Sequence, residues 1–202
     1  MNFQNLNRKI HIHLGLGLLF FVWLFSVSGL ILNHGTWKMT SFWEEREERN
    51  FDFKVSVAGL KNRAVVDAAV QHLNISGEVR LQNQTLDRLE FRIESPGVVN
   101  DIGIDLATGL GRAKEIKFNA WGKLRGVHTF NGINPEKPAD SPNWWITNLW
   151  RLSMDAVAIG LLIICFSSWI MWYKARSEFK LGYATIALSF ALAGYFVFLG
   201  LF

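Results

Sequence analysis

The chain has 202 residues, of which 50% are hydrophobic and 19% are charged, and its formal net charge is +4. This composition excludes a disordered chain, which has few apolar residues and a high net charge, and a single cysteine excludes a scaffold held by internal disulfides. A mean hydropathy of +0.16 at this charge content indicates that apolar and polar residues are segregated along the chain.

Three long runs without a charged residue predict three transmembrane helices. The runs contain 19, 18 and 22 residues and cover 14–32, 156–173 and 181–202. A helix needs about 20 apolar residues to cross the hydrocarbon core of a bilayer. We therefore predict transmembrane helices over residues 11–33, 146–173 and 181–202. A cleaved signal peptide is the alternative for the first run, but the run is longer than the roughly 7–15 apolar residues of such a peptide and no A-x-A-like site follows it.

The distribution of charge predicts the orientation of these helices. The tail 1–10 and the loop 174–180 together carry the whole net charge of +4, because residues 34–150 contain 15 basic and 15 acidic residues and Arg151 is balanced by Asp155. By the positive-inside rule, the tail and the loop are cytoplasmic. Residues 34–145 and the end of the chain then lie on the outer side. Topology thus explains the basic character, and nucleic acid is not an expected partner.

Between the first two helices, residues 55–118 have the pattern of a small folded module. Periodicity predicts one helix followed by three strands, over 63–73, 78–81, 86–93 and 98–106. A turn is expected at Asp105 to Gly109. The charge run 44–49, which precedes the module, is interpreted as a solvated helical extension. After the module, Ser141 or Asn143 is the predicted cap of the second transmembrane helix.

Several of these segments resemble a known family. The order helix, strand, strand, strand with its D-x-x-T-G at 105–109 resembles the PepSY domain. The segments RKIH at 8–11, LGL at 14–16 and SGLILNH at 28–34 resemble the first helix of PepSY-associated transmembrane proteins. Val127-His128, ahead of a helix that contains Met154-Asp155, resembles the entry into their next helix. The chain resembles a short, three-helix member of this family, whose larger members include haem-containing reductases of iron–siderophore complexes.

This resemblance implies both a fold and a location. The expected fold is a membrane protein with an α-helical bundle of three transmembrane helices. A small α+β periplasmic PepSY-like domain is inserted between helices 1 and 2. The expected location is the bacterial inner membrane, with the N-terminus in the cytoplasm and the C-terminus in the periplasm.

Two histidines stand where the first two helices are expected to meet the outer interface. His34 directly follows the first helix, and His128 precedes the second. Together with the resemblance, these positions predict a bis-His pair that ligates the iron of a b-type haem. The expected apolar wall comprises Trp37, Phe130, Trp144 and Trp145. The alternative is that both imidazoles only form hydrogen bonds at the interface. No catalytic residue is identified.

A second haem is a weaker prediction. His13 lies 21 residues before His34, which is about 31 Å along a helix and on a similar face. The second and third helices contain no histidine, so a second bis-His site would need His13 together with a histidine of another subunit. In the same helix, Gly15, Gly17 and Gly29 are predicted to allow close helix packing.

The leading functional hypothesis is a haem-dependent electron-transfer component that reduces a periplasmic acceptor such as a ferric chelate. Its expected partners are the lipid bilayer and a periplasmic protein or the ferric chelate itself. The first alternative is a non-enzymatic, membrane-anchored binding protein whose module contacts a peptidase or another partner. The second is an accessory subunit of a larger membrane complex or a homo-oligomer.

Overall fold

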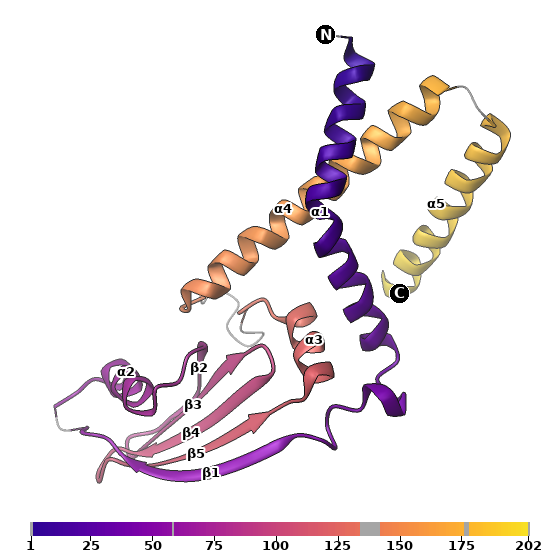
Figure 1. The fold of residues 1–202 in the computed structure, drawn as a ribbon. Helices are drawn as coiled ribbons and strands as arrows, with labels where there is room; N and C mark the ends of the chain where they lie inside the picture. Colours follow the sequence, from indigo (N-terminus) through magenta and orange to yellow (C-terminus); the bar gives the residue numbers. More distant parts are fainter. Residues whose placement is uncertain (1, 58, 134–141, 176–177, 202) are drawn as a thin grey trace. The chain divides into compact units, whose positions relative to one another are not determined.

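The computed structural model describes residues 2–57, 59–133, 142–175 and 178–201 (Figure 1). The predicted loop 174–180 is therefore described only in part, and the predicted cap Ser141 and residue 202 lie outside the described residues. The chain divides into two compact units, one made of residues 1–19 and 156–202 and the other of residues 20–155. Each unit is described by itself.

Three helices are long and apolar enough to cross a membrane, which confirms the three predicted from the uncharged runs. They are α1 (Phe3–Asn33), α4 (Trp145–Ala175) and α5 (Phe179–Leu201). Helix α4 begins one residue before its predicted start, whereas α1 begins at Phe3, eight residues before its predicted start. Hydropathy therefore locates all three helices but not the first turns of α1.

In the first unit, the amino-terminal half of α1 packs against α4 through a small residue and a polar pair. A Cβ atom added to Gly160 would lie 2.6 Å from the Cδ1 atom of Leu18, so glycine permits this close approach. The amide of Asn7 donates to the carbonyl oxygen of Ser167 over 3.2 Å. By contrast, a Cβ atom added to Gly15 or Gly17 would meet nothing within 4 Å in the described chain. The close packing predicted for these two glycines thus occurs at Gly160 instead.

The second unit contains a five-stranded antiparallel sheet with the strand order β1-β5-β4-β3-β2. The strands are β1 (Glu47–Lys54), β2 (Glu78–Gln84), β3 (Arg88–Ser95), β4 (Val98–Asp105) and β5 (Leu110–Lys117). Helix α2 (Asn62–Leu73) packs on one face of this sheet, and α3 (Ala120–Thr129) follows β5 (Figure 1). The predicted helix and the three strands after it are confirmed as α2, β2, β3 and β4.

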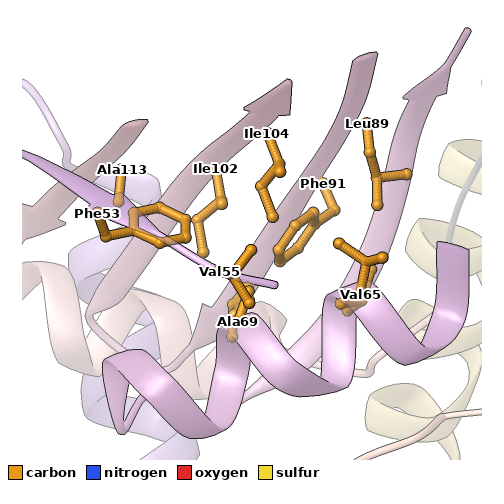
Figure 2. Packing of buried hydrophobic residues seen from close by; sticks show 11 residues of the cluster. Phe53, Val55, Val65, Ala69, Leu89, Phe91, Ile102, Ile104 and Ala113 are labelled. Atoms are coloured by element: carbon orange, nitrogen blue, oxygen red, sulfur yellow. The ribbon is translucent and has the colours of Figure 1, made fainter. Parts of the chain in front are cut away.

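A single hydrophobic core lies between α2 and the sheet. Figure 2 shows Val65 and Ala69 of α2 pointing toward the strand side chains. Phe91 of β3 and Ile104 of β4 are completely buried there. These residues lie on the strand positions that alternate with charged ones, as expected for a sheet with one face in the core and one in solvent.

The sequence predicts a helical extension for the charge run before the module, and this prediction is wrong. From Glu47 onward the chain forms the edge strand β1, which pairs with β5 along its whole length. The reason lies at the end of this strand, where Phe53 is buried in the core. A Cβ atom added to Gly111 opposite it would lie 2.3 Å from the Phe53 ring, so glycine makes room for that ring. The module therefore begins at residue 47, and its last strand, β5, had no counterpart in the prediction.

The turn between β4 and β5 is the one expected from its sequence. The Oδ1 atom of Asp105 accepts hydrogen bonds from the backbone N–H groups of Ala107 and Thr108, both over 2.9 Å. Gly109 follows with a φ of +72°, and its carbonyl oxygen accepts from the N–H of Val55 over 2.9 Å. The turn thus joins the end of β4 to the residue that follows β1.

The hydrogen bonds accepted by Asp105 predict how the stability of the fold responds to acid. The backbone and side-chain hydrogen bonds from Thr108 hold the pKa of the Asp105 carboxyl below its usual value. A lowered folded-state pKa stabilises the fold above the unfolded-state pKa, and this contribution is lost as the pH falls through the folded-state pKa. We expect Asp105→Asn to melt at a lower temperature than the wild type at neutral pH. The difference should shrink as the pH falls below the ordinary pKa of an aspartate, about 4, and a difference that stays constant on acidification would contradict the assignment.

Candidate functional site

Helix α3 carries His128 and places it against α1 within the second unit. The helix begins at a capped residue, since the side-chain oxygen of Asn119 accepts from the N–H of Gly122 over 3.1 Å. It ends at Thr129, directly after the histidine. His128 faces Ser28 and Gly29, two small residues near the carboxyl end of α1. The structure therefore confines one predicted haem ligand to a defined contact between two helices.

A short hydrogen-bond chain links the His128 ring to α1. The Nδ1 atom lies 2.8 Å from the hydroxyl oxygen of Ser28, which is completely buried. That hydroxyl is also within 3.2 Å of the carbonyl oxygen of Phe25, to which it can donate. In the tautomer with the proton on Nδ1, the Ser28 oxygen accepts from His128 and Nε2 keeps a free lone pair. Donation from one ring nitrogen to a protein oxygen is the arrangement that orients metal-binding histidines.

The surroundings of His128 are apolar and closely fitted. A Cβ atom added to Gly29 would lie 3.3 Å from Cε1 and 4.0 Å from Nε2 of the ring, so this glycine leaves the space that the imidazole edge occupies. The ring of Phe25 meets the imidazole edge-on, with 5.3 Å between the ring centres. Trp150 of α4 lies 6.0 Å from Phe25 and donates its indole N–H to the carbonyl oxygen of Phe130 over 3.1 Å.

His34 directly follows the same end of α1, and its Nδ1 atom also faces a protein oxygen. This atom is 3.0 Å from the carbonyl oxygen of Leu30, which can only accept, so Nδ1 donates and the neutral ring has its free lone pair on Nε2. The ring lies against Trp37 with 4.0 Å between the ring centres and an angle of 41° between the ring planes. Six residues separate His34 from Ser28, which corresponds to about 9 Å along the helix and about 120° around it. His34 and Ser28 are therefore close along the axis of α1 but face different sides of the helix. Because His128 bonds Ser28, the two histidines lie on different sides of α1.

The residues around His128 agree only partly with the expected haem wall. Trp37 contacts His34. The ring centres of Phe130 and Trp144 are 6.4 Å apart. Trp145 is 69% exposed. Phe25, whose ring meets His128, and Trp150, whose ring lies beside Phe25, were not predicted as parts of this wall. Phe25 and Ser28 lie three residues apart in an apolar run, where a serine next to a glycine was the available signal.

His13 lies in the first unit, and its position does not complete a second site. Its Nδ1 atom bonds the carbonyl oxygen of Lys9 over 2.8 Å, and the ring is exposed. Within the described residues, no group of three or more His, Cys, Asp or Glu side chains is placed to hold a metal ion. A pair of imidazoles would be the only protein ligands that a haem needs.

A buried carboxylate was missed by the sequence analysis. Glu78, the first residue of β2, is 2% exposed. One of its oxygens accepts from the N–H of Asn143 over 2.6 Å, and the other accepts from the N–H of Trp144 over 3.1 Å and the hydroxyl of Thr147 over 2.8 Å. The predicted cap Asn143 is thus a hydrogen-bond donor to Glu78, which provides the negative charge at the positive end of α4.

The same segment also covers the free edge of β2. The side-chain oxygen of Asn143 accepts from the N–H of Val79 over 2.9 Å, and its side-chain nitrogen donates to the carbonyl oxygen of Val79 over 2.7 Å. One amide side chain therefore pairs with both backbone groups of an edge residue. No signal in the local sequence connects residues 78–79 with residues 143–147.

No protein-family model, curated protein or solved structure matches this chain.

Proposed function

We propose that the chain is a membrane haem protein that binds b-type haem through His128 and His34 and transfers electrons to an acceptor outside the membrane. The observation that carries this proposal is the bond between Nδ1 of His128 and the buried hydroxyl of Ser28, because it holds the ring through one nitrogen and leaves Nε2 as the atom that could bind iron. His34 has the same free atom. Both donor atoms are of the kind that haem iron binds. Because the two rings lie on different sides of α1, binding to one shared iron would require one of them to leave its present position.

Each residue has a distinct part in this proposal. His128 and His34 would hold the iron, and the haem would supply one-electron chemistry. Ser28 orients His128 through the hydrogen bond at Nδ1. Gly29 leaves room beside the ring, and Phe25 contributes an apolar face that excludes water. The module would bring a soluble acceptor, such as a ferric chelate, to this end of α1.

The proposed orientation and family rest on the sequence. The basic tail and loop favour a cytoplasmic N-terminus, so the module would be periplasmic and the membrane would be the bacterial inner membrane. The PepSY resemblance supports this location. The alternative functions are a membrane-anchored binding protein, whose module would contact a peptidase or another partner, and an accessory subunit of a larger complex. In both alternatives His34 and His128 serve only in hydrogen bonding.

Visible spectroscopy of the purified protein tests the haem ligands. We expect the dithionite-reduced wild type, isolated from haem-replete cells, to show a sharp α-band. His128→Ala and His34→Ala should each abolish it, whereas His72→Ala should retain it because His72 lies on α2 beside Phe53. His13→Ala separates one haem from two, since loss of about half of the band would reveal a second site.

Ser28→Ala tests whether Ser28 acts on the haem through His128 or only supports the fold, since only the first role affects the haem midpoint potential. Without the Ser28 hydroxyl, the His128 ring loses its hydrogen bond at Nδ1, so the midpoint potential of the haem should shift while haem remains bound. Ser153→Ala is the matched control, because the Ser153 hydroxyl bonds only the carbonyl oxygen of Leu149 within α4. A colourless wild type would overturn the haem proposal and favour the membrane-anchored binding protein.

A further inference from the structure

A cleft opens on the side of α3 that carries Arg125, where the helix meets the sheet. It has a volume of about 600 Å³, within the range typical of sites for small organic ligands. Its apolar lining includes Phe42, Phe118 and Phe130, and its charged lining consists of Arg80, Glu94 and Arg125. All of these residues belong to the second unit.

The first of the two arginines, Arg80, has a hydrogen-bond donor without a partner among the described residues. Arg80 lies on β2, on the sheet face opposite the core, and its side chain is 21% exposed. One terminal nitrogen is 3.2 Å from a carboxylate oxygen of Glu94. Its Nε atom is buried and has no hydrogen-bond partner among the described residues. A buried N–H group without a partner is costly, so this donor marks a place where an acceptor would be favourable.

The second arginine has no carboxylate partner. The guanidinium of Arg125 lies over the ring of Phe42, with 4.9 Å between its central carbon and the ring centre. Within the described part of the chain, Arg125 forms no ion pair. The cleft therefore contains two guanidinium groups and one carboxylate, which leaves one positive charge to be balanced.

We propose that this cleft binds a small organic monoanion, a carboxylate carried on a flat apolar body such as an aromatic ring. The carboxylate would accept from Arg80 and Arg125, since planar guanidinium groups match carboxylate geometry. The body would pack on Phe42 and Phe118. One excess positive charge matches a monoanion better than a phosphate dianion. The assignment uses the face of α3 that carries Arg125 and is independent of the haem proposal.

Equilibrium dialysis with radiolabelled benzoate tests the site on the full chain in nanodiscs, with empty nanodiscs as the blank. We expect saturable binding with a dissociation constant below about 1 mM, and no saturable binding of benzamide, which has the ring without the charge. Arg125→Gln should weaken benzoate binding by about tenfold or more, the loss expected for one charge-assisted hydrogen bond. Arg112→Gln should leave binding unchanged, because Arg112 is 79% exposed and pairs with Asp52.

A steric variant keeps the test decisive if removal of Arg125 disturbs the fold. Thr129 lines the cleft from α3 and is exposed, so Thr129→Trp would fill the space and retain both guanidinium groups. Loss of benzoate binding in this variant supports the proposal. The proposal is overturned if benzoate shows no saturable binding to the wild type, or binds Thr129→Trp as well as the wild type. Equal binding of benzamide, or an equal loss in Arg112→Gln, would overturn it too.

Discussion

Replacement of Glu78 by alanine is expected to lower the free energy of unfolding of the second unit by about 3 kcal/mol. The carboxylate is almost completely buried and accepts three hydrogen bonds, from Asn143, Trp144 and Thr147. Alanine leaves all three donors without an acceptor. It also removes the negative charge from the positive end of α4. Few single substitutions in this chain would remove so many partners at once.

The local effect can be followed by hydrogen exchange at individual amides. In Glu78→Ala, the N–H groups of Asn143 and Trp144 should exchange at least about tenfold faster than in the wild type. Glu78→Gln should have an intermediate effect, because its amide keeps one acceptor oxygen but presents an NH₂ group to donors. Glu90→Ala is the matched control, since Glu90 forms only an ion pair with Arg88 at the surface. Unchanged exchange at both amides in Glu78→Ala would show that the carboxylate does not hold this end of α4.

Gly109→Ala should be about as damaging, for a different reason. Gly109 has a φ of +72°, a conformation that costs an L-residue roughly 1 kcal/mol or more. In addition, an added Cβ atom would lie 2.2 Å from the carbonyl oxygen of Val55, so the backbone would have to move and the bond from the Val55 N–H would be lost. We expect a total loss of about 3 kcal/mol.

A second glycine separates these two contributions. Gly59 has the same φ of +72°, but a Cβ atom added there would meet none of the described residues within 4 Å. Gly59→Ala should therefore cost only about 1 kcal/mol, the share due to the backbone conformation. Thermal melting of the purified protein, followed by tryptophan fluorescence, measures both variants. If the two substitutions lower the melting temperature equally, the contact with Val55 contributes nothing.

The parts of the fold that could be predicted are those whose signals are local. The three apolar helices follow from hydropathy along the sequence, and β3 follows from the alternation of Leu89, Phe91 and Ile93 with charged residues. Strand β1 has no such alternation in its first half, where five of the first six residues are charged or polar and all six are exposed. Its strand conformation depends on pairing with β5, more than 50 residues later, which no local pattern indicates.

The candidate site was predictable only as a set of residue types. Positions at helix ends identified His34 and His128, but the partner of His128 is Ser28, 100 residues earlier. Which residues meet across such a separation is decided by tertiary packing. The same holds for Glu78 and Thr147, which lie 69 residues apart. A pair of small residues in an apolar helix, Ser28 and Gly29, indicates that something approaches closely there but does not identify it.

The two outer strands also bear on how the protein behaves at high concentration. An open sheet edge is a template on which another chain can add a strand and begin aggregation. Here the side-chain amide of Asn143 occupies one position of the β2 edge, and five of the eight residues of β1 are charged. An incoming strand would have to displace the amide on one side or approach a dense row of charges on the other. The acidic and basic residues that concealed β1 in the sequence therefore also protect the module from self-association in a crowded compartment.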